Sequence, residues 1–154
     1  MDQLEQLKEY MEAEAYDKAV ALLPAIKERS VKSSSELMLL ARAYSKCADF
    51  AHVEKLFKKA YKVRPSKLLY RDMVEMCLDC GSTEAAEDYL QQYEKMAPGD
   101  TLNLCVLKYR IEKKKGSDYS VRIKILNDIK EYEYIPQWAY ELAKVYHKAN
   151  MKDE

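Results

Sequence analysis

Two cysteines stand three residues apart in Cys77-Leu78-Asp79-Cys80, a spacing found in redox pairs and in half of a zinc site. A second close pair would complete a zinc site, and the chain has none. The other cysteine and histidine side chains are Cys47, Cys105, His52 and His147. A shift of 33 residues places Cys80 on Cys47, so we expect this position to hold a small, buried side chain near a helix end. We predict reduced thiols with no metal and no cofactor, and one zinc ion per chain would contradict this.

Catalytic groups are sparse elsewhere in the chain. No spacing suggests a Ser/His/Asp or Cys/His set, no glycine-rich phosphate loop exists, and two histidines offer little acid-base capacity. Carboxylate pairs such as Glu84 and Glu87 are explained by solvated helix faces. Lys113-Lys114-Lys115 is expected at a helix C-terminus, where cations complement the helix dipole. We therefore predict that the protein is not an enzyme and has no catalytic residues.

Composition favours one helical domain. The chain has 154 residues but only three glycines and four prolines, too few turn residues for a many-stranded sheet protein. The 26 Lys and Arg balance the 26 Asp and Glu, which argues against binding to nucleic acid or to an anionic membrane. No apolar run reaches the roughly 20 residues of a membrane span, and the polar start does not resemble a signal peptide. We expect a cytoplasmic, all-α protein.

An internal repeat with an offset of 33 residues organises the chain. The segment from Cys47 to Glu54 falls on the segment from Cys80 to Glu87, and Pro65 falls on Pro98, without a gap. A period of this length indicates stacked helical pairs that share a continuous core. The predicted boundaries are repeats 1–33, 34–66, 67–100 and 101–134, followed by a last helix at 136–149. This gives about nine helices in a single domain covering residues 1–154.

Local signals fix the ends of these helices. Ser33 with Glu36 three residues later reads as a capping box, and Ser66 after Pro65 is a plausible N-cap. Pro24 lies inside an apolar run, where we expect it to kink a helix. Apolar residues at helical spacing define two helices in the best-preserved copy. They are Leu37, Leu40, Ala41 and Tyr44, then Val53, Leu56, Phe57 and Ala60.

These residues, ending at Pro65, resemble the tetratricopeptide repeat family, in which large, small and aromatic residues recur in this order. The next copy keeps Ala86, Leu90 and Pro98, but it has Val74 and Tyr93 where small residues are usual. The resemblance covers nearly the whole chain and is strongest from residue 34 to residue 100. It implies tandem helix-turn-helix repeats in a right-handed superhelical solenoid.

The resemblance also implies a groove lined by the first helix of each pair. The matching positions are Met38, Arg42, Ser45, Arg71, Glu75, Leu78, Cys105, Tyr109, Glu112, Tyr140, Lys144 and His147. From these we select Met38, Arg42, Arg71, Leu78, Tyr109, Tyr140, Lys144 and His147 as the candidate peptide-binding groove. Their chemistry suits an extended or helical peptide with an acidic group. The alternative is that several of them only pack or face solvent.

The resulting functional hypothesis is a cytoplasmic, non-catalytic scaffold that binds a protein or peptide and forms the N-terminal part of a longer protein. Met38 and Arg42 occupy positions where chaperone-tail clamps carry Lys and Asn, so that subclass is not expected. A peptide-sensing regulatory module is the first alternative. The second is self-association through the C-terminal helix, whose Trp138 and Tyr140 we expect to be exposed, with Trp138→Ala as its test.

Overall fold

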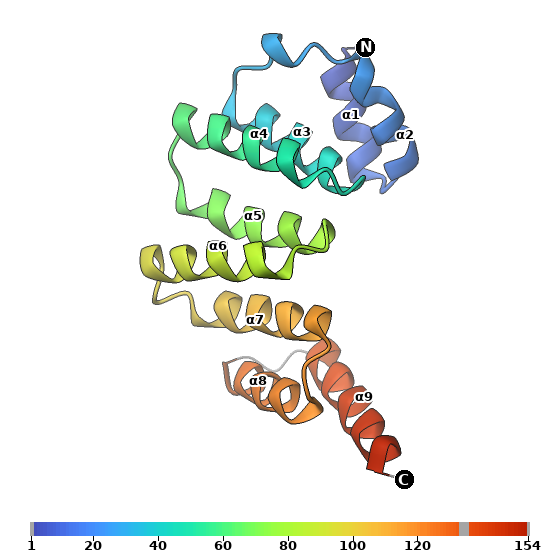
Figure 1. Cartoon of the computed structure of the whole chain (residues 1–154), viewed down its shortest axis with the longest axis vertical. Coiled ribbons are helices and arrows are strands. Elements are labelled where there is room, and N and C mark those ends of the chain that lie inside the picture. Colours follow the sequence, from blue (N-terminus) through green and yellow to red (C-terminus); the bar gives the residue numbers. More distant parts are fainter. Residues whose placement is uncertain (1, 133–135, 154) are drawn as a thin grey trace. The chain divides into compact units, whose positions relative to one another are not determined.

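The computed structural model describes residues 2–132 and 136–153, and all of their regular structure is helical (Figure 1). Over this part of the chain, nine α-helices and two short 3₁₀ helices confirm the predicted all-α class and the predicted number of helices. The end of the predicted repeat 101–134 lies outside the described residues. The helices are α1 (Gln3–Glu12), α2 (Tyr16–Leu22), η1 (Leu23–Ala25), η2 (Glu28–Ser30), α3 (Ser34–Ser45), α4 (Phe50–Val63), α5 (Lys67–Asp79), α6 (Thr83–Met96), α7 (Thr101–Lys115), α8 (Tyr119–Tyr132) and α9 (Pro136–Asp153).

The chain forms two compact units, Met1–Ser82 and Thr83–Glu154, which we call unit 1 and unit 2. The second, third and fourth helical pairs begin at residues 34, 67 and 101, and the last helix begins at residue 136. The last helix runs to Asp153, four residues beyond the predicted end at 149. One continuous solenoid domain over residues 1–154 stays a prediction.

In unit 1, the first helices of successive pairs pack side by side. Helix α3 lies against α1 and α5, and α4 covers both α3 and α5. The small residues Ala41 and Ala60 are fully buried, as expected of positions that let helices approach closely. Burial of the larger apolar side chains between these helices supplies the main stabilisation of the unit. They include Leu37, Leu40, Val53, Leu56, Phe57, Met73 and Val74.

In unit 2, α7 packs against α6 and α8, and α8 packs against α9. A cluster of buried side chains joins α7, α8 and α9, and Trp138 lies against it, partly buried. The cluster consists of Tyr109, Leu126, Ile129, Leu142 and Val145. None of the described helices in either unit combines the length and the apolarity needed to cross a membrane.

The same turn follows the first helix of four pairs. A residue with positive φ recurs at Glu14, Ala48, Gly81 and Gly116, where φ is 57°, 58°, 79° and 72°. In each case the next residue donates its N–H to the carbonyl five residues earlier, as in Ser82 to Cys77 at 2.9 Å. This is the hydrogen bond of a Schellman motif, which ends a helix with a left-handed residue. The recurring turn supports the repeat register independently of the apolar pattern.

Ala48 is a costly residue for this turn, because its Cβ opposes the left-handed conformation that Gly81 adopts without strain. We expect Ala48→Gly to raise the free energy of unfolding by about 1 kcal/mol. Gly81→Ala should lower it by about as much. A Cβ at Gly81 would meet no atom within 4 Å, so only backbone strain acts there. Urea unfolding followed by circular dichroism measures both, and shifts of the same sign would contradict the argument.

The predicted helix ends are largely confirmed. The Ser33 hydroxyl accepts the N–H of Glu36 at 3.2 Å, and the Ser66 hydroxyl accepts the N–H of Leu68 at 3.3 Å. Lys113-Lys114-Lys115 forms the last turn of α7. The expectation of a kink at Pro24 was wrong: α2 ends at Leu22, and the proline is the second residue of the 3₁₀ turn Leu23–Ala25. Proline lacks the N–H that would continue the helical bonding, so the helix ends there.

Tyr93 departs from the repeat pattern, and its contacts explain why a large residue stands there. It replaces a small residue, yet its side chain is almost completely buried in unit 2. Its hydroxyl donates a hydrogen bond to Asp100, the residue that precedes α7. Asp100 also accepts hydrogen bonds from the side-chain amide of Asn103, at 2.9 and 3.1 Å. The large residue therefore ties the end of α6 to the start of α7.

Candidate interaction surfaces

Two arginines gather around one carboxylate on the face that α3 and α5 share. Arg42 lies on α3, is half exposed, and approaches Asp72 of α5 to 3.5 Å. Burial raises the pKa of the Asp72 carboxyl, and the guanidinium groups of Arg42 and Arg71 only partly oppose this shift. One ion pair leaves most of the five N–H donors of the Arg42 guanidinium to solvent or to a ligand. This face can therefore accept a further carboxylate.

Three of the predicted groove residues do not lie on an open surface. Met38 and Leu78 are buried in unit 1, and Tyr109 is buried in unit 2. None of the three can contact a ligand in this conformation, which corrects the expectation that they line a groove. Each sits on the side of its helix that packs against neighbouring helices, and the register transferred from the repeat pattern could not separate that side from the open one.

The side chain of Lys46 connects neighbouring helical pairs of unit 1, a contact that the sequence did not predict. The ammonium of Lys46, at the end of α3, lies 3.0 Å from the Asp79 carboxylate and 4.6 Å from the centre of the Tyr16 ring. Lys46 and Asp79 are 33 residues apart, so the repeat period itself was the available signal. The contact joins the ends of α3 and α5 to the first residue of α2.

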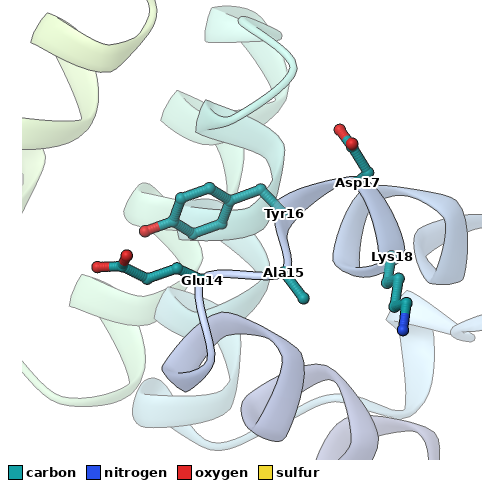
Figure 2. A pocket seen from close by; sticks show the side chains of 5 residues that line it. All are labelled: Glu14, Ala15, Tyr16, Asp17 and Lys18. Atoms are coloured by element: carbon teal, nitrogen blue, oxygen red, sulfur yellow. The ribbon is translucent and has the colours of Figure 1, made fainter.

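A shallow hollow lies beside this cation, lined by the five consecutive residues from Glu14 to Lys18 (Figure 2). Figure 2 shows the Tyr16 ring and the Glu14 carboxylate extending to the same side, and Lys18 pointing away. The turn before α2 and the first residues of α2 supply the whole lining, which gathers no set of catalytic groups. We assign the hollow no ligand.

His52 is held in a packed cluster of unit 1. Its ring stacks on Tyr44 with centroids 3.8 Å apart, and its Nε2 lies 2.9 Å from a carboxylate oxygen of Glu28. Lys59 lies 3.8 Å from the same carboxylate. Burial, followed by the charges of Glu28 and Asp49, raises the pKa of the Tyr44 hydroxyl. The cluster fastens η2 to α3 and α4, which is a structural task.

Glu141 of α9 collects three donors in unit 2. Its carboxylate accepts the hydroxyl of Tyr109 at 2.5 Å and pairs with Lys113 at 2.8 Å and Lys144 at 3.0 Å. Burial alone would raise the pKa of Glu141, but the hydrogen bonds from Lys113, Tyr109 and Lys144 outweigh it and lower the pKa to about 2. Burial raises the pKa of the Tyr109 hydroxyl, and its hydrogen bond to Glu141 raises it further. Tyr109 therefore links α7 to α9 instead of lining a groove.

The exposed side of α9 carries the other three predicted residues of unit 2. Tyr140 is 67% exposed, and the ammonium of Lys144 lies 5.0 Å from the centre of its ring. His147 is also exposed, one turn further along the same side. Trp138 packs edge-on against Tyr109 with centroids 5.9 Å apart, so it is not the exposed residue we expected. Trp138→Ala would disturb the core of unit 2 and is not a clean test of self-association.

The burial of the cysteines differs from what the repeat led us to expect. Cys47 is exposed and Cys80 is partly exposed, whereas Cys77, one turn earlier, is the buried one. Burial first, then Cys80 and Glu54, raises the pKa of the Cys77 thiol to about 12. A protonated thiol is a poor nucleophile and a poor metal ligand. Among the described residues, no three His, Cys, Asp or Glu side chains are placed to share a metal ion.

The sequence was also compared with known proteins. No protein-family model and no curated protein matches it.

Proposed function

We propose that this protein is a non-catalytic interaction module of the tetratricopeptide type, which binds a protein or peptide segment on the open face of its first helices. The observation that supports this most is the exposed Arg42 and the partly exposed Arg71 beside Asp72, on two first helices that pack side by side. A face built from parallel helices offers contacts at regular intervals, which suits an extended or helical segment.

The proposed ligand carries an acidic group at this position. A carboxylate that approaches Arg42 gains charge-assisted hydrogen bonds from a guanidinium that is already held by Asp72. In unit 2, Tyr140, Lys144 and His147 offer an aromatic and cationic surface of similar chemistry. The proposal includes a cytoplasmic location, in keeping with four free cysteines, because reducing compartments keep thiols unpaired.

The test is a selection of random displayed peptides against the full chain. Sequences rich in Asp or Glu should be enriched on the wild-type protein, and Arg42→Glu with Arg71→Glu should weaken their binding by roughly tenfold or more. The matched control, Lys55→Glu with Lys62→Glu, reverses two exposed charges on α4, away from this face. Circular dichroism verifies the fold of each variant. Equal binding of the selected peptides by all three proteins would refute the proposed face.

A further inference from the structure

A five-residue pattern of α3 returns in α9. Leucine, alanine, a basic residue, an aliphatic residue and tyrosine follow one another in both helices. The segments are Leu40-Ala41-Arg42-Ala43-Tyr44 and Leu142-Ala143-Lys144-Val145-Tyr146. Equivalent positions of two first helices are expected to meet equivalent surroundings, so differences in burial between them are informative.

Helices α3 and α9 are buried alike on one face, but a neighbouring face is buried in α3 and exposed in α9. Leu142 and Val145 are buried, as are their counterparts in α3. Ala41 is 0% exposed, whereas Ala143 is exposed. Tyr44 is partly buried and stacks on His52 of α4, whereas Tyr146 is 45% exposed. The face that α4 covers on α3 is therefore open on α9 within the described residues. We call the exposed residues Ala143, Tyr146 and Asn150, together with the partly exposed Ala139, the open α9 face.

Helix α4 defines what fits such a face. Its apolar stripe is almost completely buried, and it consists of Val53, Leu56, Phe57 and Ala60. Alanine on the first helix brings the two backbones close, and the larger side chains of the second helix fill the space on either side. The open α9 face has Ala143 at the position of Ala41 in α3, so an amphipathic helix of this pattern could approach it as α4 approaches α3.

Charge distinguishes between possible occupants. Lys144, His147 and Lys148 are exposed along α9. Glu141 is the one acidic side chain of α9 that the structure describes, and it is only 15% exposed and already paired with Lys113 and Lys144. Two copies of α9 packed together would bring cations against cations, which costs free energy. A helix with acidic flanks would instead meet complementary charges.

We propose that the open α9 face docks an acidic amphipathic helix of a partner protein, in the way that α4 covers α3. This adds a second binding site to the proposed function, on a different helix and in a different unit from the face of Arg42 and Arg71. The partner helix would place an apolar stripe of the α4 kind against Ala143 and Tyr146, and its acidic side chains near Lys144 and Lys148.

Two labelled peptides provide the probe, and fluorescence anisotropy with the full chain measures binding. The first has the sequence of residues 49–64, which is basic, and the second has Lys55, Lys58, Lys59 and Lys62 replaced by glutamate. We expect the acidic peptide to bind roughly tenfold or more tightly than the basic one. Ala143→Glu should abolish this binding, and Tyr146→Ser should weaken it. Ala51→Glu, the same substitution at an exposed position of α4, is the matched control and should leave it unchanged.

Several outcomes would overturn the proposal. Equal affinity for both peptides, or unchanged binding to both Ala143→Glu and Tyr146→Ser, would exclude an acidic helix at this face. A concentration-dependent dimer in analytical ultracentrifugation that Ala143→Glu disrupts would assign the face to a second copy. The acidic peptide should still bind the Arg42→Glu, Arg71→Glu variant, which lacks the other proposed acidic-binding face. Adding Ala143→Glu to that variant should abolish the remaining binding, so loss of one site is distinguishable from loss of the other.

Discussion

Replacing Phe57 by alanine is expected to lower the free energy of unfolding by about 3 to 5 kcal/mol, the usual loss for a large aromatic side chain in a core. Phe57 is 3% exposed, and its ring meets Tyr70 of α5 edge-on with centroids 5.2 Å apart. Tyr61 completes a three-ring cluster, at 6.1 Å from Phe57 and 5.3 Å from Tyr70. Alanine would remove the ring that holds α4 to α5 and leave a cavity that rigid helices fill only in part.

Urea unfolding followed by circular dichroism measures this loss. Val63→Ala is the matched control on α4, because Val63 is 56% exposed and should change stability by about 0.5 kcal/mol or less. Phe57→Leu keeps most of the apolar volume and should fall between the two. A loss for Phe57→Ala no larger than that for Val63→Ala would mean that the α4–α5 contact does not form in solution.

Glu141→Gln is expected to lower the free energy of unfolding at pH 7 by about 2 kcal/mol. The folded protein holds the pKa of Glu141 at about 2, below the ordinary value of 4.5. Full conversion of that shift would give about 3 kcal/mol, but Lys113 and Lys144 are nearly half exposed and solvent screens their charges. Glutamine can still accept the Tyr109 hydroxyl, so the loss reports mainly on the two ion pairs.

The pH dependence follows from the direction of this shift. A carboxylate with a lowered pKa in the folded state stabilises the protein above its unfolded pKa, and this contribution is lost as pH falls through the folded pKa. The difference between wild type and Glu141→Gln should therefore be complete above pH 4.5 and shrink between pH 4.5 and about 2. Fluorescence of Trp138, the single tryptophan, reports unfolding of unit 2.

Glu94→Gln is the control for this prediction. Glu94 pairs with Lys108 at 3.5 Å in the same unit, but both side chains are nearly half exposed. Exposed ion pairs contribute little, so the variant should lose about 0.5 kcal/mol or less. If the two glutamine variants behave alike at every pH, the three donors do not converge on Glu141 in solution.

Much of the fold followed from local patterns. Helical spacing of apolar residues, N-caps such as Ser33 and Ser66, and the offset that superposes Pro65 on Pro98 are properties of short segments, and they fixed the number and order of the helices. The kink predicted at Pro24 was wrong because the apolar pattern indicated a continuous helix. Proline lacks the N–H that would continue the helix, which instead ends at Leu22. Glu14 and Ala48 adopt the left-handed conformation but are not glycines, so their residue types did not indicate a turn.

The candidate site was less predictable. Arg42, Tyr140, Lys144 and His147 are exposed, but the same register placed buried Met38 and Tyr109 on the same face. Two residues of one helix differ in exposure because of what packs against each, and that depends on helices distant in the sequence. Glu141 was overlooked for the same reason, since two of its three donors come from another helix.

The sequence by itself determined an all-helical chain of repeated pairs, because helix periodicity, capping and turn chemistry act over a few residues. Only the tertiary structure decided which side of each helix is covered. Ala41 and Ala143 occupy the same place in the same five-residue pattern, yet one is buried beneath α4 and the other is open. Burial is a property of neighbours in space, and a binding surface consists of the positions that those neighbours leave uncovered.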